Sequence, residues 1–352
     1  MKENKRDAAP MMALCAIIFV AFTFCYLYFY QADILAAAQH VLSGGKTVYN
    51  PTVGAVIITI LLWIIHAGVY TFTGLQGRTH ALTYLPSLLL LAFITDIDTD
   101  IYRGYHFDNW LWLFPLILLA YIGIITLSHA LQPYEPEGNK GLFSKLTVVN
   151  LLQMVCMCLT VGCIGTRNDV FHYRMTMESR LIHGDPYGAL AVGREASATD
   201  SSLTMLRIAA LEQTHQLGDH LFEYPIVGGS RAMRPDDSTT YTIRYHVPRK
   251  YQNTPDHKLM AMLLDKKLDA FASAIGQYYN IDSTNVPKHF REALVLYTHH
   301  RAHPKVVYHN SVMDADFQDY QSLAHKYTNP IERKSALHDT YGNTYWYYFQ
   351  YE

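Results

Sequence analysis

The stretch "RLIHGDPYGALAVGREASATDSSLTMLRIAALEQTHQLGDHLFEYP", residues 180–225, decides the fold of the second half of the chain. It contains the pair Gly-Asp twice, at Gly184 and again at Gly218, an interval of 34 residues. Each pair ends a helical pattern, and Pro186 suits the first turn of the next helix. Between the pairs, "SATDSS" is a polar turn in which Asp200 or Ser201 is available as an N-cap. The spacing predicts short helices joined by tight turns.

The apolar positions agree with this reading. In the first helix they recur at every fourth residue, and in the third they follow the same helical spacing, which predicts one buried face on each. The residues concerned are Tyr173, Met177, Leu181, Leu203, Leu206, Ala210 and Leu211.

This stretch resembles the tetratricopeptide family, whose units of 34 residues consist of two antiparallel helices. The matching positions are Tyr173 in the first helix, Gly184 and Asp185 at the turn, and Ala189 and Ala196 at the small positions of the second helix. In the second unit Glu223 stands where the first has Ala189, and Pro225 stops the helix early. The resemblance covers about 167–223 and, more loosely, 254–330. It implies stacked helix pairs with an extended concave surface.

An insertion, about 224–253, interrupts the helical pattern. Its segment "TYTIRYHV" alternates in polarity, which predicts a short strand or an extended loop. The insertion is locally basic and rich in tyrosine, and tyrosine with arginine is the combination enriched at interface hot spots. The predicted binding residues are Arg231, Arg234, Tyr241, Arg244 and Tyr245. A plain surface loop is the alternative.

Further helices are expected after the insertion, and Pro287 opens one of them. The C-terminus, "YGNTYWYYFQYE", is too aromatic for a frayed tail. We expect a final helix whose rings pack back on the array.

The first half of the chain is dominated by apolar runs. Five of them, about 9–30, 52–73, 80–97, 109–130 and 144–165, are candidate membrane spans, because about 20 apolar residues cross a bilayer core. The third is short and contains Pro86. The sequence therefore predicts an all-α protein, with a five-helix transmembrane domain at 1–165 and a tetratricopeptide-like soluble domain at 166–352. A signal peptide cleaved after Ala38 is the alternative for the first run.

Orientation follows from the basic residues of the short loops. With the N-terminus inside, the cytoplasmic segments hold Lys2, Lys5, Arg6, Arg78, Lys140 and Lys145, whereas the opposite loops hold Lys46 and Arg103. Five crossings then place residues 166–352 outside the cytoplasm. If the third run does not cross, the second half lies inside instead.

The whole arrangement also resembles uncharacterised inner-membrane proteins of Bacteroidota, which have several spans followed by a helical periplasmic domain. The stretches "LLDKKLDAF" and "PKHFREALVLYTH" carry this resemblance. It implies a topology and no known activity.

The composition argues against several function classes. From Arg167 onward the chain holds 20 Lys/Arg and 21 Asp/Glu, a balance that does not suggest a nucleic-acid partner. All five cysteines lie in the apolar half, so the polar half has no thiolate metal site. His299 and His303 are spaced to share a metal on a helix, but Pro304 ends that helix, and we expect no metal. No cofactor-binding motif is present.

These observations predict a non-enzymatic scaffold that binds another envelope protein or polymer. The first alternative is a membrane enzyme acting on lipid-linked saccharide through the acidic loop that holds Asp96, Asp98, Asp100 and Arg103. This reading rests on analogy alone. The second alternative is a transporter component, which the few polar residues of the spans (His66, Asn150 and Gln153) disfavour.

Overall fold

The computed structural model describes residues 2–104, 109–131, 144–234 and 240–352. Every regular element in these ranges is helical, which confirms the all-α prediction. The chain divides into two compact units, Met1–Asn168 and Asp169–Glu352. Each unit is described by itself below.

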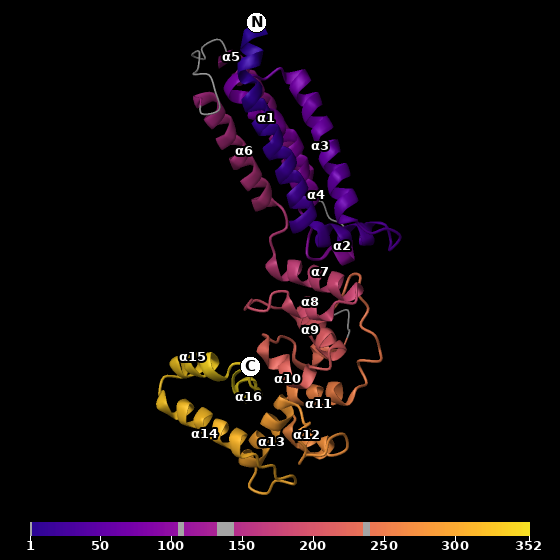
Figure 1. Ribbon diagram of the computed structural model, residues 1–352, viewed down its shortest axis with the longest axis vertical. Helices are drawn as coiled ribbons and strands as arrows, with labels where there is room; N and C mark the ends of the chain where they lie inside the picture. Colours follow the sequence, from indigo (N-terminus) through magenta and orange to yellow (C-terminus); the bar gives the residue numbers. More distant parts are fainter. Residues whose placement is uncertain (1, 105–108, 132–143, 235–239) are drawn as a thin grey trace. The chain divides into compact units, whose positions relative to one another are not determined.

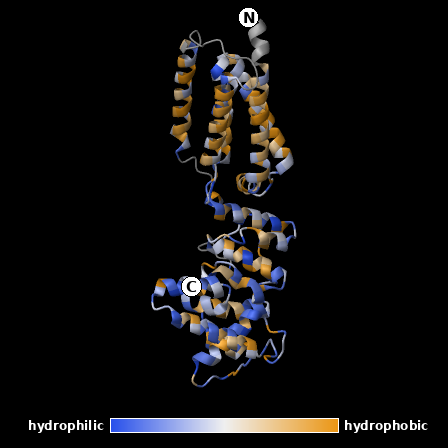
Figure 2. Ribbon diagram, turned by 60° about the vertical axis from the view of Figure 1, so that its left-hand side comes forward, coloured by the Kyte–Doolittle hydropathy of each residue, from blue (hydrophilic) through white to orange (hydrophobic). Residues whose placement is uncertain are grey.

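The first unit is a bundle of apolar helices, drawn mostly in orange in Figure 2. Its long elements are α1 (Lys2–Cys25, continued by the π-helical turn η1, Tyr26–Tyr30), α3 (Pro51–Thr73), α5 (Trp110–Leu131) and α6 (Lys145–Ile164). In the described ranges, four stretches of these helices are long and apolar enough to cross a membrane: Ala9–Tyr30, Pro51–Thr73, Trp110–Ala130 and Lys145–Ile164. The chain is thus built as a membrane protein.

Local chemistry fixes the ends of these helices. Asn50 caps α3 by accepting a hydrogen bond from the Val53 amide at 3.0 Å, and Pro51 occupies the first turn. Gly74 ends the same helix with a left-handed φ of 60°. The shorter helix α2 (Ala32–Leu42) follows η1.

The third predicted span is not one long helix. Residues Gly77–Tyr84 form a 3-10 helix, η2, and the α-helix α4 begins only at Leu85 and ends at Thr95. Pro86 lies in the first turn of α4, because a proline inside a helix lacks the amide hydrogen and clashes with the preceding turn. At about 1.5 Å per residue, α4 alone is about half the thickness of a bilayer core.

Together, η2 and α4 nevertheless run the whole length of α6. Near the start of α6, Asn150 accepts from the Ala81 amide at 2.7 Å and donates to the Gly77 carbonyl at 2.9 Å. Just beyond its end, the Thr166 hydroxyl donates to the Thr95 carbonyl at 3.0 Å. Eight 3-10 residues at about 2.0 Å and eleven α residues at about 1.5 Å together span about 32 Å.

Segment 77–95 also contacts other helices of the bundle. The Ser87 hydroxyl donates to the Leu62 carbonyl of α3 at 2.9 Å, and the indole of Trp110 in α5 donates to Asp96 at 2.7 Å. The ring of His66 in α3 stacks on Tyr84 with centroids 3.6 Å apart. The segment 77–95 is therefore an inner member of the bundle, packed between α3 and α6 (Figure 1).

The second unit is an array of short helices in which neighbours along the chain pack on each other (Figure 1). The helices are α7 (Asp169–Ile182), α8 (Pro186–Ala191), α9 (Ser201–Gln213), α10 (Leu217–His220), α11 (Pro255–Leu264), α12 (Leu268–Ile275), α13 (Lys288–His300), α14 (Ser311–Lys326), α15 (Pro330–Tyr341) and α16 (Tyr345–Tyr351). The short 3-10 turns η5 (Leu221–Glu223) and η6 (Gly229–Met233) lie between α10 and α11.

The predicted helix-ending turn is present at the first Gly-Asp pair but not at the second, because α9 ends at Gln213 and Gly218 lies inside α10. Gly184 has a φ of 73°, and Asp185 caps α8 by accepting from the Gly188 amide at 2.8 Å. Asp200 caps α9, as predicted, by accepting from the Leu203 amide at 2.6 Å.

The second helices of the predicted pairs are much shorter than a tetratricopeptide unit requires. Helix α8 ends at Ala191, so Ala189 is buried between helices but Ala196 lies outside any helix and is half-buried. Helix α10 is a single turn. The strand alternative for "TYTIRYHV" is wrong, since this segment is an irregular loop with a bend at residues 243–244.

The C-terminal prediction is confirmed. Helix α16 packs against α13, and its first four residues are buried. The Trp346 indole donates to the Glu292 carbonyl at 2.8 Å, while the Tyr345 amide donates to the Glu292 carboxylate at 2.8 Å. The rings of α16 thus form part of the core of the second unit.

Candidate functional site: a groove beside two shortened helices

An open groove of about 670 Å³ lies where α8 and α10 stop early. It is lined by Tyr187, Leu190, Ala191, Arg194, Glu195, Leu211, Gln216, His220, Glu223 and Tyr224. Longer second helices would fill this volume, because in a stack of helix pairs they pack against one another. Pro225 prevents this in the second unit, since it cannot continue a helix.

A buried arginine holds two edges of the groove together. The Arg207 side chain of α9 is among the most completely buried in the chain, and its guanidinium donates to the Gly193 carbonyl at 3.1 Å and to the Pro225 carbonyl at 3.3 Å. Burial lowers the pKa of Arg207, and Tyr224 and Asp200 act in the opposite direction. Because the Arg207 guanidinium donates to backbone carbonyls, it holds in place the loop at Gly193 and the loop at Pro225.

Glycine is required at one of these edges. Gly193 has a φ of 58°, and a Cβ atom there would lie 2.9 Å from the ring of Tyr173. The Tyr224 hydroxyl, in turn, donates to the Leu190 carbonyl at 3.4 Å. The groove is therefore preformed, which reduces the entropy that a ligand loses on binding.

A polar network crosses the groove. Glu223 accepts from Arg194 at 3.3 Å and contacts the His220 Nδ1 atom at 2.8 Å, so one carboxylate joins α10–η5 to the loop after α8. Beside it, Tyr187 exposes 64% of its surface. The groove thus offers an exposed aromatic ring, hydrogen-bond donors and hydrogen-bond acceptors within one concave surface.

Sequence reasoning did not identify this groove. The signal was present in Glu223 and Pro225, which depart from the repeat pattern at the position where a small residue and a continuing helix belong. These departures were interpreted as a weaker match rather than as space for a ligand.

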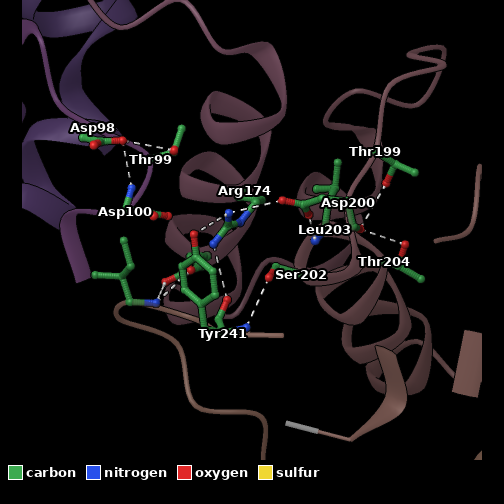
Figure 3. Close-up of polar contacts among 12 residues, drawn as sticks. Asp98, Thr99, Asp100, Arg174, Thr199, Asp200, Ser202, Leu203, Thr204 and Tyr241 are labelled. Atoms are coloured by element: carbon green, nitrogen blue, oxygen red, sulfur yellow. Dashed lines mark hydrogen bonds and ion pairs between the residues drawn. The ribbon is translucent and has the colours of Figure 1, made fainter. Parts of the chain in front are cut away.

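The predicted binding residues of the insertion lie in two settings. Arg231 and Arg234 are exposed on and just after η6, and residues 235–239 lie outside the described ranges. Tyr241 instead packs on Arg174, with the guanidinium 4.2 Å from the ring centroid and a hydrogen bond of 3.1 Å to the hydroxyl. Figure 3 shows Arg174 between Tyr241 and Asp200, to which it also donates at 3.2 Å.

Tyr245 is buried and accepts a hydrogen bond from Gln213 at 2.8 Å, while Arg244 is half-buried. The structure therefore does not bring the five predicted binding residues into one site. Tyr241 and Tyr245 attach the insertion to α7 and α9, and Arg231 and Arg234 remain accessible.

Glu178 provides the strongest attachment of the insertion. Its carboxylate is 1% exposed and accepts hydrogen bonds from three successive amides, those of Ile243 at 3.0 Å, Arg244 at 2.7 Å and Tyr245 at 3.2 Å. Burial raises the pKa of Glu178, while the three amides and Arg174 lower it. Nothing in the residues around Glu178 indicated that its carboxylate would bind the insertion.

A small cavity of about 10 Å³ lies between α9, α11 and the insertion. That volume is at the lower limit for a single water molecule. Glu212 lines it and accepts from the Thr254 hydroxyl at 2.9 Å, with His257 Nδ1 at 3.2 Å. This buried group secures the end of the insertion to α9 and leaves no room for a larger ligand.

The residues of the enzyme alternative form local contacts. Asp96 accepts from Trp110, Asp98 accepts from the Thr99 hydroxyl and the Asp100 amide at 3.2 Å each, and Arg103 lies 3.9 Å from Asp100. These contacts shape the turn after α4. Among the described residues, no group of three or more His, Cys, Asp and Glu side chains is arranged to hold a metal ion.

The paired histidines of the C-terminal half are separated by the end of α13. His299 lies 3.7 Å from Asp314 and beside the ring of Phe317, whereas His303 follows the helix in an exposed bend. Helix α13 ends at His300, four residues before Pro304.

In the first unit, sequence reasoning noted His66 but missed its companions. His80 and Tyr84 of η2 lie beside it, with the His80 ring 6.4 Å from that of His66. All three are buried in the bundle. The spacing of 14 residues between the histidines carried no periodic signal, because His66 lies on α3 and His80 on η2, and a short loop separates these two helices.

Comparison with known proteins adds one match. A family model described as a family of unknown function, DUF6057, matches residues 225–352, from the start of the insertion to the C-terminus. The lining of the groove ends at Tyr224 and lies outside the matched residues. The match agrees with the expected resemblance to uncharacterised proteins. Neither the curated proteins nor the solved structures contain a match to this chain.

Proposed function

We propose that the protein is a membrane-anchored scaffold whose helical second unit binds another envelope protein or a polymer. The observation that carries this proposal is the groove, which is preformed, concave and accessible. Binding sites of this kind combine a shaped apolar surface with a few placed polar groups. In a stack of helix pairs, as in tetratricopeptide proteins, such a surface serves binding and requires no catalytic residues.

We further propose that the anchor crosses the membrane five times. The composite segment 77–95 is long enough for a bilayer core of about 30 Å, and its hydrogen bonds link it to both ends of α6. An irregular backbone is tolerated at membrane depth when other helices surround it. The excess of Lys/Arg then places the N-terminus in the cytoplasm of a bacterial cell and residues 166–352 in the periplasm.

Reporter fusions test this topology with opposite expected outcomes. If segment 77–95 crosses, a fusion after residue 140 reports the cytoplasm and one after residue 250 reports the periplasm. If the chain crosses four times, the fusion after residue 140 reports the periplasm and the fusion after residue 250 reports the cytoplasm. A fusion after Lys46 reports the periplasm in either case and serves as the control. A periplasmic signal at 140 would contradict the five-pass anchor.

Site-specific photo-crosslinking tests the scaffold. A photoreactive amino acid replaces Tyr187 in the groove, and in a matched control it replaces Tyr278, which is 41% exposed and does not line the groove. We expect a discrete adduct, protein or polymer, from position 187 in living cells and none from position 278. Equal labelling at both positions, or none at 187, would refute binding in the groove.

A further inference from the structure

We propose that the ligand of the groove is a neutral oligosaccharide segment of an envelope polymer. This inference rests on the proposed function, because it names the class of ligand for the same groove. Three properties of the lining carry it: its balance of charge, its mixture of donors and acceptors, and its exposed tyrosine ring.

The charge of the lining argues against a polyanion. Among the described residues of the lining, Arg194 is the single Lys/Arg side chain, while Glu195 and Glu223 are both acidic. Proteins that hold phosphate-rich or other polyanionic ligands present a clear excess of Lys/Arg. Arg194 is already paired to Glu223 at 3.3 Å and His220 contacts the same carboxylate at 2.8 Å, so neither of these two basic side chains of the described lining is left for a phosphate or sulfate group.

The hydrogen-bonding groups suit hydroxyls. A hydroxyl both donates and accepts, so its best environment places carboxylate oxygens next to N–H donors. Glu223 lies between Arg194 and His220, and Gln216 adds an amide with both functions. An extended peptide would instead need partners at the regular spacing of its backbone amides, and in this groove the polar groups cluster around one carboxylate.

The apolar part of the groove suits the faces of sugar rings. The C–H bonds of a pyranose carry partial positive charge and pack against the negative face of an aromatic ring. Tyr187 presents such a face, and Leu190, Ala191 and Leu211 supply apolar surface beside it. Tyr187 is 64% exposed, so its ring is available to a ligand at the rim of the groove.

The rigid walls add a constraint on the ligand. Arg207 fixes both edges, so a glycan must fit the existing groove rather than reshape it. The volume of about 670 Å³ lies within the range of small-molecule sites and accommodates a few sugar rings rather than one.

The test uses the full chain in detergent micelles and saturation-transfer NMR. The probes are neutral tetrasaccharides of N-acetylglucosamine, glucose, mannose and galactose, together with a lysine-rich decapeptide. We expect saturation of at least one tetrasaccharide by the wild type and by Tyr278→Ala. Tyr187→Ala should weaken that binding about tenfold, because the exposed ring is lost and the fold is unaffected. Glu223→Gln should weaken it less, since the amide keeps one acceptor.

Three results would overturn the inference. These are the absence of saturation for all four tetrasaccharides, saturation that Tyr187→Ala leaves unchanged, and binding of the decapeptide alone. If sugars fail while the crosslinker at position 187 still captures a protein, the scaffold stands and the ligand class is wrong. If crosslinking and sugar binding both fail, the proposed function falls as well.

Discussion

Replacing Glu178 with methionine tests how the insertion is held. The substitution keeps the length of the side chain but removes the acceptor of three buried amides, those of Ile243, Arg244 and Tyr245. Each buried amide left without a partner costs about 1–3 kcal/mol. Burial disfavours the ionised carboxylate of Glu178, which is why it raises the pKa of this group. Removing the carboxylate therefore offsets part of the cost. We therefore expect a net local loss of about 3 kcal/mol, at the low end of the sum.

Hydrogen exchange read by mass spectrometry on the full chain measures this loss directly. A loss of about 3 kcal/mol corresponds to exchange about a hundredfold faster at amides 243–245. Glu178→Gln is the matched control. Its amide oxygen can take the place of Oε2, which contacts all three amides, so its effect should be about 1 kcal/mol or less. Equal exchange in the wild type and the methionine variant would show that Glu178 does not secure the insertion.

Two further predictions concern the core of the second unit. Trp346→Ala should destabilise it by about 3–5 kcal/mol, because it creates a cavity and leaves the Glu292 carbonyl without its indole partner; unchanged resistance of α16 to proteolysis would contradict this. Tyr279→Phe removes a hydroxyl that donates to the half-buried Asp256, whose pKa is raised by desolvation and lowered by this bond. Without this bond, the pKa of Asp256 in the folded protein rises further. A carboxyl group whose pKa is raised in the folded state favours folding while it is protonated, and this contribution is lost as pH increases. The denaturation midpoint should therefore fall more at pH 7 than at pH 4.

Local signals in the sequence predicted local structure well. Asp185, Asp200 and Gly184 perform their predicted roles because a cap or a turn depends only on a few neighbouring residues. The long apolar runs became long helices for the same reason. The third run did not, because Pro86 and the polar groups of Asn150 and Thr83 select a 3-10 segment that only the assembled bundle can stabilise.

The length of the helices and the burial of α9 could not be predicted in the same way. The apolar stripe of α9 indicated one buried face, yet every residue from Ser202 to Glu212 is buried. The insertion covers the other face, where the Ser202 and Thr204 hydroxyls accept from the amides of Tyr241 and Val227. The predicted binding role of the insertion remains a prediction, but its large side chains now have a packing role that sequence alone did not suggest.

The features that weaken the resemblance to a regular helical repeat also create the groove. A regular second unit would place a small residue at position 223 and continue the helix past position 225, and the next turns would then cover Leu190, Leu211 and Tyr187. Pro225 ends the helix, and Glu223 can face the open space because no helix packs on it. The Arg207 guanidinium then binds the carbonyl of Pro225 itself, so the residue that interrupts the repeat also anchors one edge of the groove. The interruption is held at both edges by the Arg207 guanidinium, and fixed walls of this kind favour the proposed binding role because a ligand then orders less of the protein.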